Sequence, residues 1–278
     1  MKYIDLHVHS TASDGTMRPA QLVDYACEKG LYAIAITDHD SVDGIPYAMK
    51  QAVKRPVKII PGVELSASAD GIGVHMLGYN VDYQNADFIS ALRKICYLRE
   101  ERNMKLCSQL KAYGMDIDYE KIRSEVDSFV ITRGQIADEM IRKGYIETKA
   151  EAFSKYIGKG APCYVPKNKI AVSDAVKMIL QVGGIPVLAH PVKYALTDDE
   201  YIRLFTYLKS LGVRGIEGIY STNTPEEEKK FCHMAADLGF IVTGGSDFHG
   251  KNKPDIDMGT GRGNLKIPAA ILHNLGLE

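Results

Sequence analysis

Cysteine is sparse in this chain and follows no metal-binding or redox spacing. The five residues are odd in number and no two of them form a CxxC pair; they are Cys27, Cys96, Cys107, Cys163 and Cys232. This pattern predicts free thiols in a reducing compartment rather than a disulfide framework.

Long apolar runs and an excess of basic charge are also missing. No hydrophobic stretch approaches the length of a transmembrane helix, and the opening MKYIDLHVH has no signal-peptide pattern. The formal net charge is −1 and the sequence pI is near 6.7, which argues against a broad basic surface for long nucleic acid. We therefore expect a cytoplasmic protein that binds neither a membrane nor long nucleic acid.

The chain does contain a pattern of alternating strands and helices. Its 278 residues, 45% of them hydrophobic, are enough for one large α/β domain. Two helix starts carry capping boxes, Thr197 with Glu200 and Thr224 with Glu227. Strands that alternate with helices predict parallel β structure with right-handed crossovers.

The middle of the chain departs from this alternation. Residues 87–165 have a helical pattern, and only the segment SFVIT at 128–132 resembles a strand. We therefore expect an α/β domain made of residues 1–86 and 166–278, interrupted by a helical insertion over 87–165 that acts as a substrate cap.

Histidines and carboxylates collect at the expected ends of the strands. Six of the eight histidines lie in such segments. In a barrel of parallel strands these ends meet at one face, where active sites are found. The candidate residues are His7, His9, Asp14, His39, Glu64, His75, His190, Asp247 and His249.

This set of side chains predicts a metal centre. Histidine mixed with carboxylate suits Zn, Mn or Fe, and the absence of cysteine argues against a structural zinc site. Nine ligands exceed what one ion needs, so we expect two or three divalent ions. Clustered ions suit phosphoryl transfer because they activate water and neutralise charge on the attacking and leaving oxygens.

Several polar residues near this set have two interpretations. Asp5, Asp38 and Asp40 could orient the imidazoles or make ordinary hydrogen bonds. Glu217, which ends a strand, could line the site or anchor a loop. The remaining histidines, His233 and His273, lie on helical patterns, and we expect them at the surface or in packing contacts.

The chain resembles the PHP family, named for polymerase and histidinol phosphatase, in DLHVHSTASDG, AITDHD, PGVELS, HMLGY, AHP and GSDFHG. The resemblance spans nearly the whole chain and is strongest to small bacterial phosphoesterases of nucleotides and short RNA. It implies a distorted (β/α)7 barrel, similar to a TIM barrel, with a metal cluster at the strand ends.

The resemblance also implies how the ligands divide among three ions. One group would be His7, His9, Glu64 and Asp247. A second would be Glu64, His75 and His190, with Glu64 bridging the two ions, and a third would be Asp14, His39 and His249. We assign the catalytic role to His190 and Asp247 together with Arg133.

The insertion offers residues for the substrate. Arg133 stands at an expected helix start, where backbone N–H groups and a guanidinium could hold a phosphate. In related phosphoesterases a histidine often follows two positions after this arginine, whereas here it is Gln135. We assign substrate binding to Arg133, Gln135 and Lys167.

Two further groups of basic residues lie in the insertion or directly after it. Lys155, Lys159, Lys167 and Lys169 could form either a solvated loop or a basic rim for an anionic substrate. On the long helix glutamates are interspersed among the basic residues, which predicts a solvated face for Arg93, Lys94, Arg99, Arg102 and Lys105.

The combined pattern predicts a metal-dependent phosphoric ester hydrolase that uses an activated hydroxide on nucleoside monophosphates or 3′,5′-bisphosphates. The alternatives are a 5′→3′ exoribonuclease on short RNA, a histidinol phosphate phosphatase, a metal hydrolase of C–N bonds and a non-catalytic metal-binding module. No G-x-S-x-G segment suggests a serine nucleophile.

Overall fold

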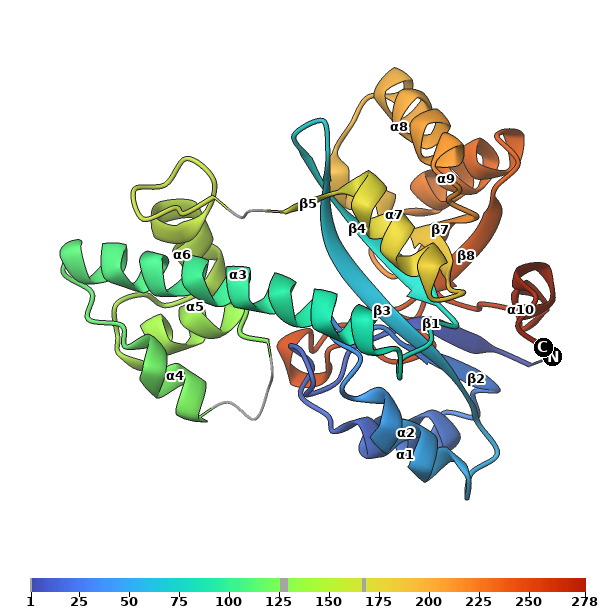
Figure 1. The fold of residues 1–278 in the computed structure, drawn as a ribbon, viewed down its shortest axis with the longest axis horizontal. Helices are drawn as coiled ribbons and strands as arrows, with labels where there is room; N and C mark the ends of the chain where they lie inside the picture. The colour runs from blue at the N-terminus through green and yellow to red at the C-terminus, as the bar shows by residue number, and fades with distance from the viewer. Residues whose placement is uncertain (1, 126–129, 167–168) are drawn as a thin grey trace. The chain divides into compact units, whose positions relative to one another are not determined.

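The computed structural model describes residues 2–125, 130–166 and 169–278. The chain divides into two compact units, Met1–Ser90 with Lys169–Glu278, and Ala91–Asn168. The first unit carries a barrel-shaped sheet and the second is helical (Figure 1).

Seven strands follow one another around the barrel in the order β1-β2-β3-β4-β6-β7-β8, and the short β5 pairs with β3. The strands are β1 Ile4–Val8, β2 Ala33–Ile36, β3 Lys58–Ala69, β4 Ile72–Tyr79, β5 Ile170–Ala171, β6 Ile185–Leu188, β7 Gly215–Tyr220 and β8 Ile241–Gly245. The barrel is nearly closed, because the end of β1 meets the segment after β8. There the His9 N–H donates to the Phe248 carbonyl at 2.9 Å and the Asp247 N–H donates to the His7 carbonyl at 2.9 Å. The expected α/β barrel is confirmed.

The expectation of an all-parallel sheet is wrong at one strand. β4 runs antiparallel to both β3 and β6, while the other neighbours along the barrel are parallel. A tight turn at Asp70 and Gly71, both with positive φ, joins β3 to β4 as a hairpin. His75 therefore lies in the middle of β4 rather than after its end, opposite Ser66. Glu64 likewise lies inside the long β3.

Helices of the first unit pack on the outside of the barrel (Figure 1). They are α1 Pro19–Glu28, α2 Ile45–Ala52, α7 Val172–Gln181, α8 Asp198–Ser210, α9 Pro225–Asp237 and α10 Ala270–Leu275, with 3₁₀ turns η2 Pro191–Tyr194 and η3 Gly250–Asn252. Leu22 and Val23 of α1 share a core with Ile34 and Ile36 of β2. Both predicted capping boxes are present, at the starts of α8 and α9.

The second unit has a core of its own. Its helices are α3 Ala86–Ala112, which begins in the first unit, α4 Tyr119–Glu125, α5 Arg133–Arg142, α6 Lys149–Ala152 and the π-helix η1 Phe153–Ile157. Leu106 and Leu110 of α3 pack with Ile136 and Met140 of α5. Residues 130–132 of the suspected strand SFVIT are irregular, and Ser128 and Phe129 lie outside the described residues.

In the part of the chain that the structure describes, none of the helices combines the length and the apolar character that crossing a bilayer requires.

Candidate metal centre

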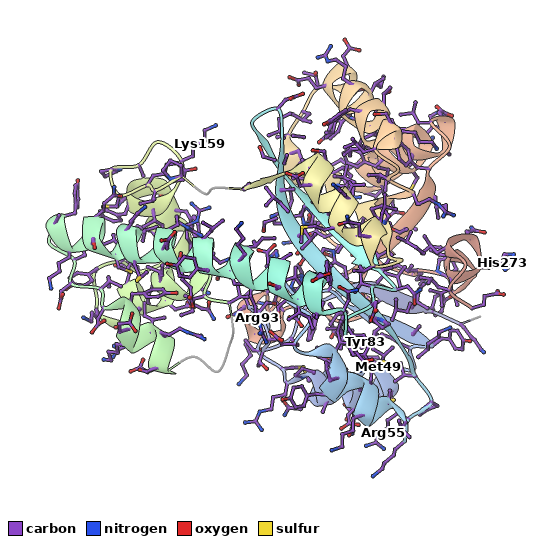
Figure 2. The ribbon with its side chains drawn as sticks, viewed as in Figure 1. Met49, Arg55, Tyr83, Arg93, Lys159 and His273 are labelled. Atoms are coloured by element: carbon purple, nitrogen blue, oxygen red, sulfur yellow. The ribbon has the colours of Figure 1, made fainter. Side chains whose placement is uncertain are left out.

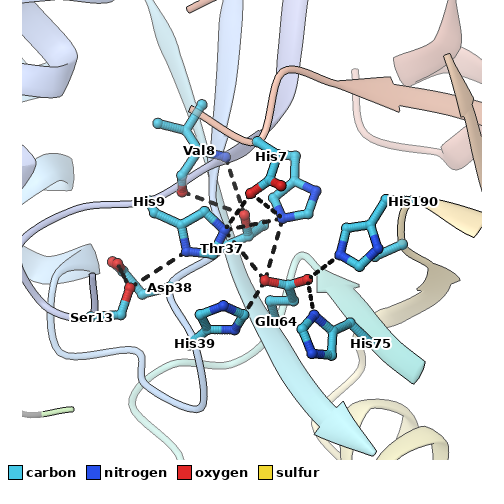
Figure 3. A network of polar contacts seen from close by, with 12 residues as sticks. His7, Val8, His9, Ser13, Thr37, Asp38, His39, Glu64, His75 and His190 are labelled. Atoms are coloured by element: carbon cyan, nitrogen blue, oxygen red, sulfur yellow. Dashed lines mark hydrogen bonds and ion pairs between the residues drawn. The ribbon is translucent and has the colours of Figure 1, made fainter. Parts of the chain in front are cut away.

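The nine candidate ligands converge at one end of the barrel, and Figure 3 labels six of them, namely His7, His9, His39, Glu64, His75 and His190. β1 carries His7 and is followed at once by His9, and the loop beyond it carries Asp14. The remaining residues come from β3 and β4 and from the segments after β2, β6 and β8; they are Glu64, His75, His39, His190, Asp247 and His249.

Glu64 lies at the centre of this cluster and is almost completely buried. Its Oε1 atom is 2.8 Å from His75 Nδ1 and 2.9 Å from His190 Nε2. Its Oε2 atom lies 3.0–3.4 Å from nitrogen atoms of His39, His9 and His7. One carboxylate thus faces five imidazoles, the arrangement expected of a ligand shared between ions.

Two aspartates flank this centre. Asp247 Oδ1 is 3.3 Å from His249 Nδ1 and 3.4 Å from His9 Nε2. Asp14 Oδ1 is 3.2 Å from His249 Nε2, and Asp14 Oδ2 is 3.9 Å from His39 Nε2. Each aspartate therefore approaches the histidines through ring nitrogens that can bind a metal.

Several imidazole nitrogens and carboxylate oxygens of the cluster have lone pairs that are available to metal ions. His7 Nδ1 lies 2.9 Å from Glu217 Oε1, so a neutral His7 with its proton on Nδ1 directs the lone pair of Nε2 into the cluster, where His9 Nε2 is 3.1 Å away. His190 Nδ1 is buried with no hydrogen-bond partner among the described residues. Three groups have ligand atoms within 4.8 Å of one another, namely His9, Asp14, His39 and His249; His7, His9 and Glu64; and His39, Glu64 and His75.

Burial and neighbouring charges shift the pKa values of several side chains in the cluster. Burial raises the pKa of Glu64, but the charges of His39, His75 and His7 outweigh it and hold that pKa well below its usual value. Burial lowers the pKa of His9, whereas hydrogen bonds to Asp247 and Glu64 raise it, with a net value of about 9. Burial lowers the pKa of His190 to about 3, so this imidazole is neutral and available as a ligand.

Glu217 both lines the site and anchors a loop. Its Oε1 atom is 2.9 Å from His7 Nδ1, which orients that ring, and its Oε2 atom accepts a hydrogen bond from the His190 N–H at 2.8 Å. Asp5 and Asp38 instead make ordinary hydrogen bonds to serines, Asp5 to Ser246 and Asp38 to Ser10 and Ser13. Asp40 accepts from the Ser66 N–H at 2.9 Å.

The backbone is strained at two of the candidate ligands. His190 has φ of 25° and Asp247 has φ of 58°, values that non-glycine residues rarely adopt. Hydrogen bonds from the His190 N–H to Glu217 and from the Asp247 N–H to the His7 carbonyl hold these conformations. Strain that the surroundings stabilise is typical of functional sites.

The model of the PHP domain matches residues 5–157, more than half of the chain. The chain belongs to the PHP family. A curated relative from Haemophilus influenzae, named a 5′-3′ exoribonuclease, is 31% identical over 89% of this chain and 90% of its own length. A relative from Chromobacterium violaceum, named a 3′,5′-nucleoside bisphosphate phosphatase, is 30% identical over 93% of this chain and 91% of its own.

A solved structure from Bifidobacterium adolescentis, whose title proposes a metal-dependent phosphoesterase, superimposes on this PHP protein with a TM-score of 0.85. The two chains are 26% identical, and the match covers 98% of this chain and 94% of the other. This protein therefore shares its fold with a structure described as a metal-dependent phosphoesterase, and its barrel carries groups of side chains that could hold a metal ion.

The insertion residues that we assigned to the substrate lie within the second unit of this PHP protein. Arg133 is the first residue of α5, and its Nη1 donates to the Ile157 carbonyl at 3.0 Å. Gln135 forms a capping box with Thr132, because its Oε1 accepts from the Thr132 N–H at 2.7 Å. The T-x-x-Q spacing was the signal for this role. Lys167 lies outside the described residues.

The predicted solvated face of the long helix is wrong for two residues. Arg99 and Arg102 are each only 6% exposed, whereas Arg93, labelled in Figure 2, is exposed. Arg102 Nε has no hydrogen-bond partner in the described chain. Burial and the neighbouring guanidinium groups of Arg133 and Arg99 lower the pKa of Arg102 to about 9.

The other basic and imidazole side chains behave as solvated groups. Lys155 pairs with Glu151 at 2.9 Å, and Lys159 is exposed. The side chains of His233 and His273 are 77% and 73% exposed, as expected of residues outside the metal centre. His273 is labelled in Figure 2.

Proposed function

We propose that this protein is a metal-dependent phosphoric ester hydrolase that removes phosphate from nucleotides, namely a nucleoside monophosphate or 3′,5′-bisphosphate. The observation that carries the proposal is the cluster of nine histidine and carboxylate side chains with Glu64 at its centre, five of whose imidazole neighbours are labelled in Figure 3. The relative named a 3′,5′-nucleoside bisphosphate phosphatase, similar along nearly its whole length, supports the choice of substrate.

The nine side chains would hold two or three divalent ions, which we propose to be Mn, Fe or Zn. The short distances from Glu64 to His7, His9, His75 and His190 support its assignment as the bridging ligand. Bound ions of this kind lower the pKa of water and neutralise charge on phosphoryl oxygens. We retain His190 and Asp247 as the catalytic residues, since both adjoin the centre on strained backbone.

Arg133 would bind a phosphate group, and Arg102 would help it. Arg102 is buried, its Nε atom has no hydrogen-bond partner and its guanidinium no carboxylate ion pair in the described chain, and the charges of Arg133 and Arg99 act against its positive charge. A buried cation without a carboxylate is costly unless an anion binds beside it. Arg133 also stacks near Phe153 and Tyr164, with its Cζ 5.2 and 5.9 Å from their ring centroids.

A second candidate function is 5′→3′ removal of nucleotides from short RNA by the same chemistry. The relative from Haemophilus influenzae carries this name and is similar along nearly its whole length. The two functions differ in the bond that is hydrolysed, which is a phosphodiester between two nucleotides in the exonuclease and a phosphate monoester in the phosphatase.

One assay separates these candidates. The protein is supplied with Mn²⁺ and with AMP, a nucleoside 3′,5′-bisphosphate, a 5′-phosphorylated trinucleotide or histidinol phosphate. We expect phosphate release from one of the mononucleotides. Mononucleotides released from the trinucleotide with little free phosphate would indicate the exonuclease, and no turnover of any compound would contradict both proposals.

A further inference from the structure

Two lysines converge on the carboxylate of Asp247 from the side opposite to the histidines. Lys193 Nζ is 2.8 Å and Lys253 Nζ is 2.7 Å from Asp247 Oδ2. The Tyr220 hydroxyl donates to the same oxygen at 2.6 Å. The other oxygen, Oδ1, faces the imidazoles of the metal centre, so one carboxylate connects two differently charged regions.

Both lysines reach Asp247 through the same local structure, a 3₁₀ turn. Each of the two ligand histidines at the ends of β6 and β8 is followed directly by a 3₁₀ turn, η2 after His190 and η3 after His249. Lys193 lies within the first turn, and Lys253 caps the second. A tight turn of three residues brings a side chain back toward the residue where the turn began.

Both ammonium groups have the same direct partner. Asp247 is the one carboxylate within 4.0 Å of either ammonium group among the described residues. Glu64 and Glu217 act on Lys193 from farther away, and with Asp247 they raise its pKa against the effect of burial, so Lys193 is held in its charged form. The side chains of Lys193 and Lys253 are 41% and 29% exposed while that of Asp247 is 4% exposed, so the ammonium groups lie where solvent meets the buried centre.

We propose that Lys193 and Lys253 bind the phosphoryl oxygens of the substrate at the edge of the metal centre. The ligand class is a phosphate monoester dianion, whose oxygens can accept hydrogen bonds from the solvent-facing side of the two ammonium groups. Lysine binds phosphate as a compact point charge, without the planar geometry that arginine requires. This inference rests on the proposed function and names two residues that it does not otherwise use.

The test compares Lys193→Met, Lys253→Met and the double variant with the unaltered protein. Inorganic phosphate is titrated calorimetrically onto the Mn²⁺-loaded proteins, and bound manganese is measured by elemental analysis. We expect each single change to weaken phosphate binding about 10-fold and the double change about 100-fold, the scale of about one charge-assisted contact each. Bound manganese should stay unchanged.

Two further variants serve as controls. Lys251→Met removes an exposed lysine from η3 and should leave phosphate affinity within about twofold, a normal surface effect. Lys253→Arg keeps the positive charge and should recover most of the affinity lost in Lys253→Met. Recovery by arginine supports a role in binding an anion rather than in packing.

Two results would overturn the inference. An unchanged phosphate affinity in the double variant would show that the lysines do not contact the anion. A loss of bound manganese would assign them to holding Asp247 in place. Because phosphate binding is measured without turnover, a protein that binds phosphate through the lysines but hydrolyses no ester would contradict the proposed function and leave this inference standing.

Discussion

Replacing Arg102 by methionine should make the protein more stable and a poorer binder of phosphate. Arg102 is 6% exposed, and its Nε atom lacks a hydrogen-bond partner in the described chain. Its nearest charged neighbours include Arg133 and Arg99, which repel it. Methionine is shorter but keeps the flexible apolar stem without a charge, so the substitution removes an unfavourable charge while it keeps part of the packing.

The expected magnitude follows from the pKa of Arg102. A pKa lowered from the ordinary value of 12.5 to about 9 corresponds to about 5 kcal/mol of free energy acting against the charged form. Local relaxation and penetrating water reduce such penalties in real proteins, and some packing of the arginine stem is lost. We therefore expect Arg102→Met to raise the free energy of unfolding by about 1–3 kcal/mol.

Urea unfolding without phosphate measures the stability, and calorimetric titration with inorganic phosphate measures the binding. Arg93→Met is the matched control, because it removes an exposed cation from the same helix and should change stability by less than about 0.5 kcal/mol. A destabilised Arg102→Met protein that binds phosphate normally would refute the reasoning, since Arg102 would then be a satisfied structural residue.

Three other predictions concern the barrel. His9→Ala should abolish phosphate release while the fold persists, with the exposed His233→Ala as control; turnover in a metal-replete His9→Ala sample would contradict the ligand assignment. Gly245→Ala should destabilise the protein by several kcal/mol, measured by thermal unfolding, because the new Cβ would lie 2.2 Å from His7 Cβ. Burial lowers the pKa of His9 but Asp247 and Glu64 raise it to about 9, so His9 is protonated near neutral pH. Manganese binding should then release protons and tighten as the pH rises toward about 9, which calorimetry in buffers of different ionisation enthalpy would detect; binding without proton release would refute this.

The periodicity of the sequence was sufficient for most of the fold. Apolar segments ending in polar residues identified the barrel strands, and the T-x-x-E spacings identified the starts of α8 and α9. The direction of β4 could not be obtained in this way, because a buried strand has the same pattern in either direction. The signal for a hairpin was the Asp70-Gly71 pair between two apolar runs, a dipeptide typical of tight turns.

The candidate ligands were predictable for a physical reason. Histidine and carboxylate side chains are costly to bury without a partner, so their occurrence beside buried strands indicates a shared ligand. The partner of each side chain was not predictable from spacing. Glu217 illustrates this, since its contacts with His7 and the His190 N–H depend on the closure of the barrel.

The residues that the sequence did not single out are positively charged side chains, namely Arg102, Lys193 and Lys253. Arg102 precedes Leu106 by four positions and Leu110 by eight, so it lies on the face of α3 that these leucines bury, although neighbouring glutamates suggested a solvated helix. Lys193 and Lys253 look like ordinary surface lysines until the structure brings both to one oxygen of Asp247. The burial of Arg102 beside two other arginines is difficult to explain by stability, because it disfavours the charged form. Binding of an anion accounts for it and for the two ammonium groups at the edge of the metal centre, and it is the same requirement that a phosphorylated substrate would impose.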